Sequence, residues 1–351
     1  MKLNLLTMHY SLSCGAVLQT YATCKILKQM GCDVTIINFK NPIELRRRKS
    51  LKYWLGYGII KWKFDRFRDK FYPKQTKEFF KLSYEDLPYA DVYMTGSDQI
   101  WNPLVVEQNL FTYMLDFLPL GVKRFSYASS FGIEDWRSYA DLSSKVKNEL
   151  LKFHPLSVRE DSGVAICDKY FNLKATQVLD PTLLLDNYSE LVSNVKQRNE
   201  VVCFKLEYNN DFVKSVLFIR SKLNIKTTLL YSVYPRFSFD KSVMFCSPIE
   251  WLKYIASAKL VITDSYHGLV FALIFNKNFI ILGGNRKKTT RIRSLLKIVN
   301  LESRFLENYD QLIKKQHLLY ENIDYDFVNR ILEEKRKESL DFLKNAINQN
   351  K

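Results

Sequence analysis

Residues 2–39 decide the fold, and they read KLNLLTMHYSLSCGAVLQTYATCKILKQMGCDVTIINF. The first part, Lys2–Met8, is typical of a β-strand. The apolar residues that then recur at the spacing of one helix face are Leu18, Tyr21, Ala22 and Ile26. Gly31 is placed to end this helix, and Val34–Phe39 predicts a second, buried strand. A strand, a helix and a strand within forty residues predict a βαβ unit and therefore a parallel sheet.

The same alternation continues along the chain in two sets. The first set contains the predicted strands Asp91–Thr95, Phe125–Ser129, Leu156–Arg159 and Gln177–Leu179. The second set contains Val201–Leu206, Thr227–Tyr231, Leu260–Thr263 and Phe279–Leu282. Two successive sets predict an α/β protein in which two Rossmann-like domains face a central cleft.

Three regions follow from this pattern. We expect an N-terminal Rossmann-like domain over residues 1–185, with a basic, aromatic insertion at about 42–82. A C-terminal Rossmann-like domain is expected over residues 186–310, and a helical segment over residues 311–351. The helical tail is indicated by apolar residues that share one helix face, namely Phe327, Val328, Ile331 and Leu332.

Composition bounds the class of protein. The chain has 351 residues, of which 47% are hydrophobic, and this excludes global disorder. Its formal net charge of +16 indicates anionic partners, which are phosphorylated substrates, nucleic acid or an anionic membrane surface. Six cysteines without a C-x-x-C pair are expected to be free thiols in a reducing cytoplasm. We find no signal peptide and no apolar run that spans a bilayer, and we expect a cytoplasmic protein or one held on the inner face of a membrane.

Much of the positive charge lies in one segment. Residues 46–81 contain 13 basic and three acidic residues, with ten aromatics among them. A solvated helical hairpin is one interpretation of such a charge run. A surface helix on anionic lipid also explains the aromatic residues, including Trp54 and Trp62. Nucleic acid is the least favoured partner, because the chain has no zinc-finger, KH or RNP signature.

The most informative chemical motif lies between Ser247 and Leu282. Ser247-Pro248-Ile249-Glu250 is a capping box that opens a helix. The strand Leu260–Thr263 is followed at once by Asp264-Ser265-Tyr266-His267-Gly268 and a second helix. Polar residues at the carboxyl end of a parallel strand face the ligand crevice, and a helix N-terminus there attracts an anion. His267 is therefore either beside a phosphate or carboxylate site or a structural histidine in a turn.

Similar clusters follow other predicted strands. Gly15 with Gln19 forms a glycine-bearing turn that leads into a helix, but the dinucleotide motif G-x-G-x-x-G is absent. Ser97 and Asp98 supply a hydroxyl and a carboxylate, and Arg159 suits bidentate binding of an anion or a surface pair with Glu160. Five cations after the last predicted strand form a solvated loop or an anion clamp, and they are Arg286, Lys287, Lys288, Arg291 and Arg293.

The other histidines carry weaker signals. His9 follows the first strand and is placed to face the same crevice, whereas His154 and His317 are assigned no role. The four histidines lack H-x-x-x-H or H-E-x-x-H spacing, so we expect neither a metal site nor metal-dependent chemistry.

Several ordered blocks resemble the polysaccharide pyruvyl transferase family. They are Gly15–Ala22, Gly96–Asn102, Ser126–Gly132, Ser157–Glu160, Val178–Leu184 and Thr263–Gly268, and the stretch Arg291–Arg304 also fits. Together the blocks cover roughly residues 1 to 310, and six in the same order are specific where any single one is weak. The basic segment and the C-terminal helix lie outside them.

The resemblance implies a fold like that of GT-B glycosyltransferases. It implies transfer of the enolpyruvyl-derived group of phosphoenolpyruvate to a sugar of a cell-surface polysaccharide, such as an exopolysaccharide or capsule, or of its lipid-linked precursor. The product is a pyruvate ketal, and no cofactor is implied beside the donor. The matching residues are His267 for catalysis and Arg159 for donor binding. Ser265, Asp264, Gly15, Gln19, Ser97, Asp98 and Arg291 are the further candidates for substrate binding.

The residues are consistent with that chemistry. Ketal formation needs a general acid near neutral pH, and histidine is suited to that role. We expect His267→Ala to fold but lose transfer, and Arg159→Ala mainly to raise the KM for phosphoenolpyruvate. Two other functions share part of the pattern, namely a GT-B-type glycosyltransferase that uses a nucleotide sugar, and a non-enzymatic membrane or nucleic-acid scaffold. All of the enzymatic expectations require that Arg159 and His267 share one cleft.

Overall fold

The computed structural model describes residues 1–40, 51–232, 238–283 and 289–349, and of residues 51–55, 231 and 232 only the backbone. By its contacts the chain forms two units. The first unit contains Met1–Ser50, Asp65–Leu185 and Glu333–Lys351, and the second contains Leu51–Phe64 and Asp186–Leu332. The basic residues Arg46, Arg47, Arg48 and Lys49 and the predicted loop cations Arg286, Lys287 and Lys288 lie outside the described residues.

The first unit is built on a parallel sheet of four strands in the order β2-β1-β3-β4. These strands are β1 (Lys2–Leu6), β2 (Asp33–Ile36), β3 (Val92–Thr95) and β4 (Arg124–Ser126). A second, two-stranded parallel sheet contains β5 (Ser157–Val158) and β6 (Thr176–Gln177), and a bridge between Ser129 and Val158 connects it to the first. The order 2-1-3-4 is flavodoxin-like, with its switch point between β1 and β3.

The second unit is built on a six-stranded parallel sheet in the order β12-β11-β10-β7-β8-β9. Its strands are β7 (Glu200–Phe204), β8 (Lys226–Ser232), β9 (Lys241–Met244), β10 (Leu260–Thr263), β11 (Asn278–Leu282) and β12 (Phe305–Leu306). Counted along the chain, this is the Rossmann order 3-2-1-4-5-6, in which the order reverses between β7 and β10. The predicted Rossmann-like α/β fold is therefore confirmed in each unit, although the short strands β9 and β12 were not predicted.

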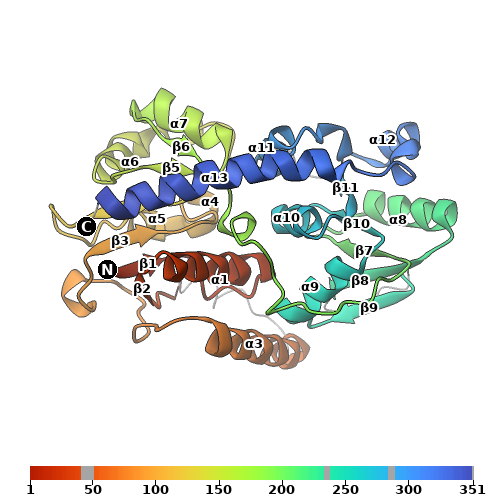
Figure 1. Ribbon diagram of the computed structural model, residues 1–351, viewed down its shortest axis with the longest axis horizontal. Helices are drawn as coiled ribbons and strands as arrows, with labels where there is room; N and C mark the ends of the chain where they lie inside the picture. Colours follow the sequence, from red (N-terminus) through yellow and green to blue (C-terminus); the bar gives the residue numbers. More distant parts are fainter. Residues whose placement is uncertain (41–50, 233–237, 284–288, 350–351) are drawn as a thin grey trace. The chain divides into compact units, whose positions relative to one another are not determined.

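Helices connect the strands, as Figure 1 shows. In the first unit they are α1 (Cys14–Gln29), α4 (Pro103–Val106), α5 (Leu110–Tyr113), α6 (Ser143–Leu150) and α7 (Asp161–Phe171). In the second unit they are α8 (Asn210–Leu223), α9 (Pro248–Ser257), α10 (Tyr266–Ile274), α11 (Thr290–Ile298) and α12 (Tyr309–Lys314). Two further helices, α3 (Leu51–Phe71) and α13 (Tyr325–Gln349), contribute residues to both units.

Local sequence signals account for the ends of several helices. The predicted capping box opens α9, with Ser247 accepting from the backbone N–H of Glu250 and the Glu250 carboxylate accepting from that of Ser247. After α1, Gly31 has a φ of +80°, which only glycine adopts readily. Gly15 was predicted in a turn, but α1 already begins at Cys14, so Gly15 lies in the first helical turn.

The expected C-terminal helical segment, residues 311–351, contains part of α12 and all of α13. Residues of α13 up to Leu332 contact the second unit, and those from Glu333 contact the first. In the first unit the Ser339 hydroxyl of α13 accepts a hydrogen bond from the backbone N–H of Leu179 at 3.0 Å. Within the described residues no helix is both long and apolar enough to cross a bilayer.

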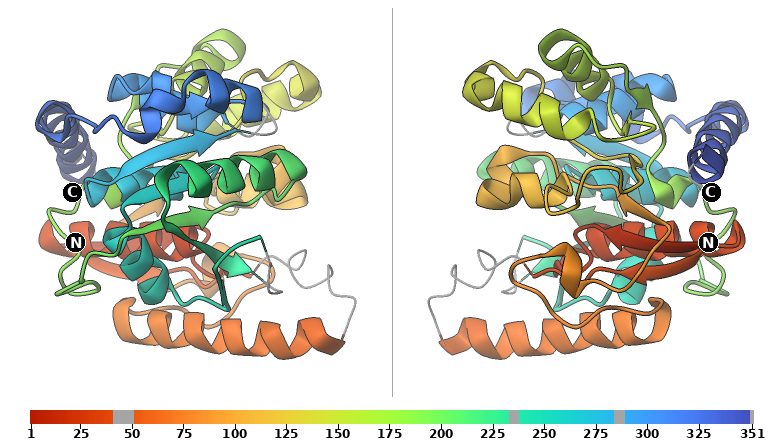
Figure 2. Two further views of the ribbon diagram at one scale, coloured as in Figure 1. Left: turned by 90° about the vertical axis from the view of Figure 1, so that its right-hand side faces the viewer. Right: turned by 90° about the vertical axis from the view of Figure 1, so that its left-hand side faces the viewer.

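The central strands of the two larger sheets are buried, because helices cover parallel strands. Every residue of β3 and of β10 is buried. Each unit has its own apolar core, formed around residues such as Trp101 and Phe131 in the first and Phe212 and Ile262 in the second. Figure 2 shows the same elements from two further sides. This arrangement leaves the carboxyl edges of the strands as the places where polar side chains gather.

Candidate functional site

The two switch points of the sheets carry buried polar clusters. In open α/β sheets ligands bind outside the carboxyl ends of the strands where the strand order reverses. Here those positions are the ends of β7 and β10 in one unit and the ends of β1 and β3 in the other. Each cluster is described within its own unit.

At the switch point of the second unit Lys205 contacts Asp264. Lys205 follows β7 and Asp264 follows β10, and the Lys205 Nζ lies 2.6 Å from the Asp264 carboxylate. The same ammonium donates to the carbonyl oxygen of Leu282 at 3.0 Å. Asp264 also accepts from the backbone N–H groups of Leu206 and Glu207 at 2.7 and 3.0 Å. One buried ion pair therefore joins the ends of β7, β10 and β11.

His267 comes directly after this pair, in the first turn of α10. Its side chain is buried, with a 6% exposed fraction. Ser265 is the N-cap of α10 and its hydroxyl accepts from the backbone N–H of Gly268 at 3.4 Å. A Cβ on Gly268 would lie 2.4 Å from the Thr263 hydroxyl, so the glycine lets α10 start close against β10. The imidazole is thus held at a helix N-terminus, where the helix dipole favours an anion.

Arg291 lies beside the same helix end. Its guanidinium carbon is 5.7 Å from the centre of the Tyr266 ring, and Tyr266 is the first residue of α10. The structure therefore brings together four of the predicted residues, which are Asp264, Ser265, His267 and Arg291. Arg293, by contrast, donates to Glu307 at 3.2 Å.

In the first unit the Arg159 side chain is buried between two aspartates. Its guanidinium is 2.7 Å from the carboxylate of Asp180 and 3.4 Å from that of Asp98. Ser97 donates to Asp180 at 3.0 Å and lies 3.4 Å from the guanidinium. The Arg159 side chain is only 1% exposed and that of Asp180 is fully buried. One guanidinium thus faces two carboxylates, and the cluster has a formal charge of −1.

Gln19 reaches this network through the β1–β3 switch point. Its amide donates to the Thr7 hydroxyl at 2.9 Å, and that hydroxyl donates to the carbonyl oxygen of Ser97 at 3.0 Å. The amide oxygen of Gln19 is buried without a hydrogen-bond partner among the described residues. Ser97, Asp98, Arg159 and Gln19 therefore lie together, and Gly15 is in the turn of α1 that precedes Gln19.

We predicted that His9 faces the crevice, and this prediction is wrong. It is fully buried, with Nδ1 at 3.2 Å from the Thr7 carbonyl oxygen and Nε2 at 3.1 Å from the Asn38 side-chain oxygen. Burial lowers the pKa of His9 from 6.5 to about 4, and the positive charges of Arg68 and Lys40 act in the same direction. His9 is therefore a neutral, structural histidine near pH 7.

The comparisons with known proteins agree with the motifs. A family model for polysaccharide pyruvyl transferases matches residues 14–286, most of the chain. The chain belongs to the polysaccharide pyruvyl transferase family. It is accordingly a transferase, and the predicted family is confirmed. No curated protein matches the chain.

Solved structures of sugar-nucleotide enzymes share the fold of this pyruvyl transferase family member. The UDP-GlcNAc 2-epimerase from Neisseria meningitidis bound to UDP-GlcNAc is 9% identical, over 99% of this chain and 100% of its own, with a TM-score of 0.55. The UDP-GlcNAc 2-epimerase from Methanocaldococcus jannaschii is 13% identical over 92% and 93%, with a TM-score of 0.53. Arabidopsis thaliana UGT89C1 complexed with UDP-L-rhamnose is 10% identical over 98% of both chains, with a TM-score of 0.51. At these identities the likeness establishes the GT-B-like fold alone.

Two residues of the family member's clusters were missed from sequence, namely Lys205 and Asp180 as partners of Asp264 and Arg159. Lys205 lies inside the otherwise apolar run Val201–Leu206. A single charge near the end of a buried strand was the sequence signal that could have identified it. Asp180 was included only as a member of the block Val178–Leu184, whereas its carboxylate caps the next turn and binds Arg159.

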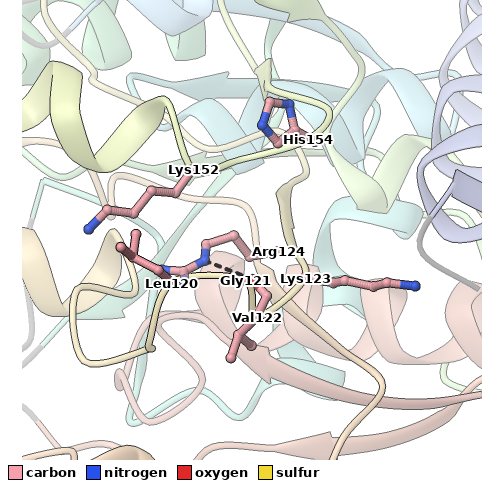
Figure 3. Close-up of a pocket in the computed structure, with 7 residues that line it drawn as sticks. All are labelled: Leu120, Gly121, Val122, Lys123, Arg124, Lys152 and His154. Atoms are coloured by element: carbon pink, nitrogen blue, oxygen red, sulfur yellow. Dashed lines mark hydrogen bonds between the residues drawn. The ribbon is translucent and has the colours of Figure 1, made fainter.

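One pocket of the first unit lies away from these clusters. It has a volume of about 330 Å³ and is lined by Leu120, Gly121, Val122, Lys123, Arg124, Lys152 and His154 (Figure 3). Arg124 is the first residue of β4 and the other lining residues precede β4 or β5, so the pocket lies at the amino ends of these strands. Lys123 and Lys152 extend in opposite directions in Figure 3, and Lys152 binds Glu149 at 2.7 Å. The pocket therefore lacks converging polar groups and is not the candidate site.

Proposed function

We propose that this protein transfers the enolpyruvyl-derived group of phosphoenolpyruvate onto a sugar of a cell-surface polysaccharide or of its lipid-linked precursor. The observation that carries the proposal is the position of His267. It lies inside the family match, in the first turn of α10, directly after the ion pair at the switch point of the second sheet. No cofactor is needed beside the donor in this proposal.

The chemistry assigned to His267 is a proton transfer. The imidazolium gives its proton to the methylene carbon of the donor, which leaves an oxocarbenium-like centre at the neighbouring carbon. Two hydroxyls of one sugar then form C–O bonds to that carbon, and the bond to the phosphate oxygen breaks. One hydroxyl proton returns to His267 and the other leaves with phosphate. The products are a pyruvate ketal and inorganic phosphate.

The second unit suits the anionic donor. Phosphoenolpyruvate carries a phosphate and a carboxylate, and the N-terminus of α10 offers positive potential to such groups. Arg291 adds a guanidinium beside Tyr266. The charge of Asp264 does not oppose the donor there, because Lys205 neutralises it at 2.6 Å. We assign Arg291 and Ser265 to donor binding, with Asp264 and Lys205 as positioning residues.

The first unit suits a neutral sugar. Its cluster of Arg159, Asp98 and Asp180 has a formal charge of −1, which disfavours a polyanion and provides carboxylate acceptors for hydroxyl groups. Asp98 is the more accessible acid, with a 13% exposed side chain. We assign Asp98 and Ser97, with Gln19 and Gly15, to the acceptor, and Arg159 to holding the acids in place. That Arg159 and His267 share one cleft stays a prediction.

The decisive experiment is incubation with phosphoenolpyruvate and a panel of lipid-linked and synthetic glycosides. NMR should show a new ketal methyl signal together with release of phosphate. The absence of both with every acceptor, under conditions where the protein is folded, would count against the proposal.

The alternative is a glycosyltransferase that uses a nucleotide sugar, because solved structures with the same fold are bound to UDP-sugars. Thermal shift separates the two functions. A ligand at a hundred times its Kd stabilises the folded state by about 2.7 kcal/mol. Phosphoenolpyruvate should raise the Tm and UDP-GlcNAc should not, and the reverse result would favour the alternative.

For the place of action we propose the cytoplasmic side of a membrane, where lipid-linked acceptors are found. Phosphoenolpyruvate is a small cytoplasmic anion, and a protein that meets both substrates works at that boundary. The high net charge of +16 supports attraction to an anionic surface.

A further inference from the structure

Helix α3 has two very different faces along its described side chains. On the inner face Phe64 is fully buried, Phe67 is 3% exposed and Arg68 is 3% exposed. Gly56 lies on this face too, where a Cβ would approach the ring of Phe245 to 2.4 Å. The spacing of these residues, with steps of three, four and eight, is that of one packed stripe on a helix. This face is therefore the packed face of α3.

The outer face carries an exposed apolar pair. Ile59 is 47% exposed and Trp62 is 56% exposed, three residues apart and thus side by side on the helix. One and two turns further on, Arg66 and Lys70 are exposed on the same stripe. The four residues are three or four positions apart in α3, so their side chains form a single row along the helix. Figure 2 shows α3 as one continuous helix. We call Ile59, Trp62, Arg66 and Lys70 the outer row.

The exposure of Trp62 is unusual within this molecule. Trp101, Trp136 and Trp251 are all fully buried. A tryptophan that is more than half exposed beside an exposed isoleucine costs solvation free energy, which association with an apolar boundary would recover. The neighbouring positive charges indicate that this boundary is anionic.

Other charged residues of α3 flank the outer row. Asp65 binds Arg68 at 2.7 Å on the inner side, and Lys63 binds Glu250 at 2.9 Å. Asp69 is the one exposed acid beside Arg66 and Lys70 among the described residues of α3. The outer row therefore has an apolar end, Ile59 and Trp62, and a basic end, Arg66 and Lys70.

We propose that the outer row of α3 is a docking surface for an anionic lipid bilayer. Trp62 and Ile59 enter the interface between headgroups and acyl chains, where indole rings are stable, and Arg66 and Lys70 meet lipid phosphates. Nucleic acid is the weaker occupant, because an exposed isoleucine has no partner on a phosphate backbone. The inference goes beyond the transfer chemistry and does not depend on the identity of the donor.

The test is sedimentation of the full chain with vesicles of phosphatidylcholine alone and of phosphatidylcholine mixed with phosphatidylglycerol. Binding is expected only to the anionic vesicles, and it should weaken as salt is raised. Trp62→Ser should weaken it about tenfold, since it removes the largest apolar group of the row. Arg66→Gln with Lys70→Gln should weaken it about 25-fold, because each base near an anionic surface contributes about fivefold.

Matched controls come from exposed residues elsewhere. Leu120→Ser removes a side chain that is 84% exposed, and Lys214→Gln with Lys253→Gln removes two exposed charges. These controls should bind like the unmodified protein, and circular dichroism should show that every variant is folded. Loss of binding in the controls equal to that in the outer-row variants would overturn the proposal, since the overall charge would then explain the adsorption.

Two further results would also overturn it. One is absence of binding to anionic vesicles, and the other is binding of an oligonucleotide with the same dependence on Trp62, Arg66 and Lys70. Turnover of a water-soluble glycoside separates this proposal from the proposed reaction. The outer-row variants should keep that turnover, so a failure of vesicle binding and a failure of transfer are distinguishable.

Discussion

The carboxyl edges of the two sheets differ in the balance of their charges. At the β7–β10 edge one lysine, Lys205, meets one aspartate, Asp264, and Arg291 lies beside the following helix. Near the β1–β3 edge one arginine, Arg159, meets two aspartates. The same topological rule gathers polar residues at both edges. In our proposal, the sign of the remaining charge, rather than the location, assigns the anionic donor to the second edge and the neutral sugar to the first.

The strongest test of this comparison is His267→Ala. We expect the variant to fold and its rate of ketal formation to fall by about 10² to 10⁴, because general acid catalysis contributes that much. The measurement is the initial rate of phosphate release with a saturating acceptor. His317→Ala is the matched control, since the side chain of that histidine is 66% exposed and lies 3.9 Å from Glu321.

The control should keep its full rate. If His267→Ala retains more than about a tenth of the activity, general acid catalysis by this residue is wrong. An equal loss in His317→Ala would show that the assay responds to something other than the β10–α10 edge.

Arg159→Ala probes the opposite edge. It leaves Asp98 and Asp180 without their buried counter-charge, and breaking such a pair costs about 3–5 kcal/mol of the free energy of unfolding. Arg159→Ala should change the KM for phosphoenolpyruvate less than Arg291→Ala does, because we assign Arg291 to donor binding. Urea unfolding and steady-state kinetics measure the two effects.

This result would decide between two roles of Arg159. The family resemblance alone predicts that Arg159→Ala mainly raises the KM for the donor. Unchanged stability with a raised KM would support that role and would place the donor at the first edge. Lowered stability with an unchanged KM would support the acceptor assignment.

The sequence was sufficient for the fold because its signals were local. Alternating apolar strands and helices, Gly31 and the Ser247–Glu250 capping box each depend on neighbours in the chain, and all are found in the structure. The short strands β9 and β12 escaped prediction because they have four and two residues. A period cannot be recognised over so few positions.

The candidate site was less predictable because its contacts are long-range. Arg159 looked like half of a surface pair with Glu160, yet Glu160 accepts from Ser130 and from the backbone of Gly132, each at 2.9 Å. The real partners of Arg159 are 21 and 61 positions away. Likewise, no pattern in the chain connects Lys205 with Asp264, which are 59 positions apart. Only the strand order brings these groups together.

The pH dependence of stability tests the buried histidine of the first edge. The pKa of His9 is lowered to about 4 in the folded state from about 6.5, so between these values the unfolded state binds the extra proton. Stability should therefore rise with pH across this window and fall as pH drops through it, by about 3 kcal/mol in total. Urea unfolding at several pH values measures this slope.

His9→Asn supplies the comparison, because it removes the titrating ring. The unmodified protein and His9→Asn should differ in their free energy of unfolding. This difference should shrink as pH falls from about 6.5 to 4 and stay constant above that range. A difference that does not depend on pH would mean that His9 keeps an ordinary pKa, and the first edge would then carry another positive charge in mild acid.

The smallest effect separates capping from ligand binding at the second edge. Ser265 and Ser247 are both serine N-caps, but Ser265 accepts from Gly268 at 3.4 Å, whereas Ser247 accepts at 3.2 Å within a reciprocal box. Replacing a serine cap by alanine costs about 1 kcal/mol, and we expect Ser265→Ala to cost less than Ser247→Ala. If Ser265 binds the donor as well, Ser265→Ala should also raise the KM for phosphoenolpyruvate, and Ser247→Ala should not.

Ser265→Gly sharpens the test because glycine replaces a cap at a cost of only a few tenths of a kcal/mol, so a raised KM in that variant reflects the lost hydroxyl rather than a frayed helix. Equal KM values in all three variants would restrict Ser265 to the helix end and leave Arg291 and the backbone of α10 to hold the anion.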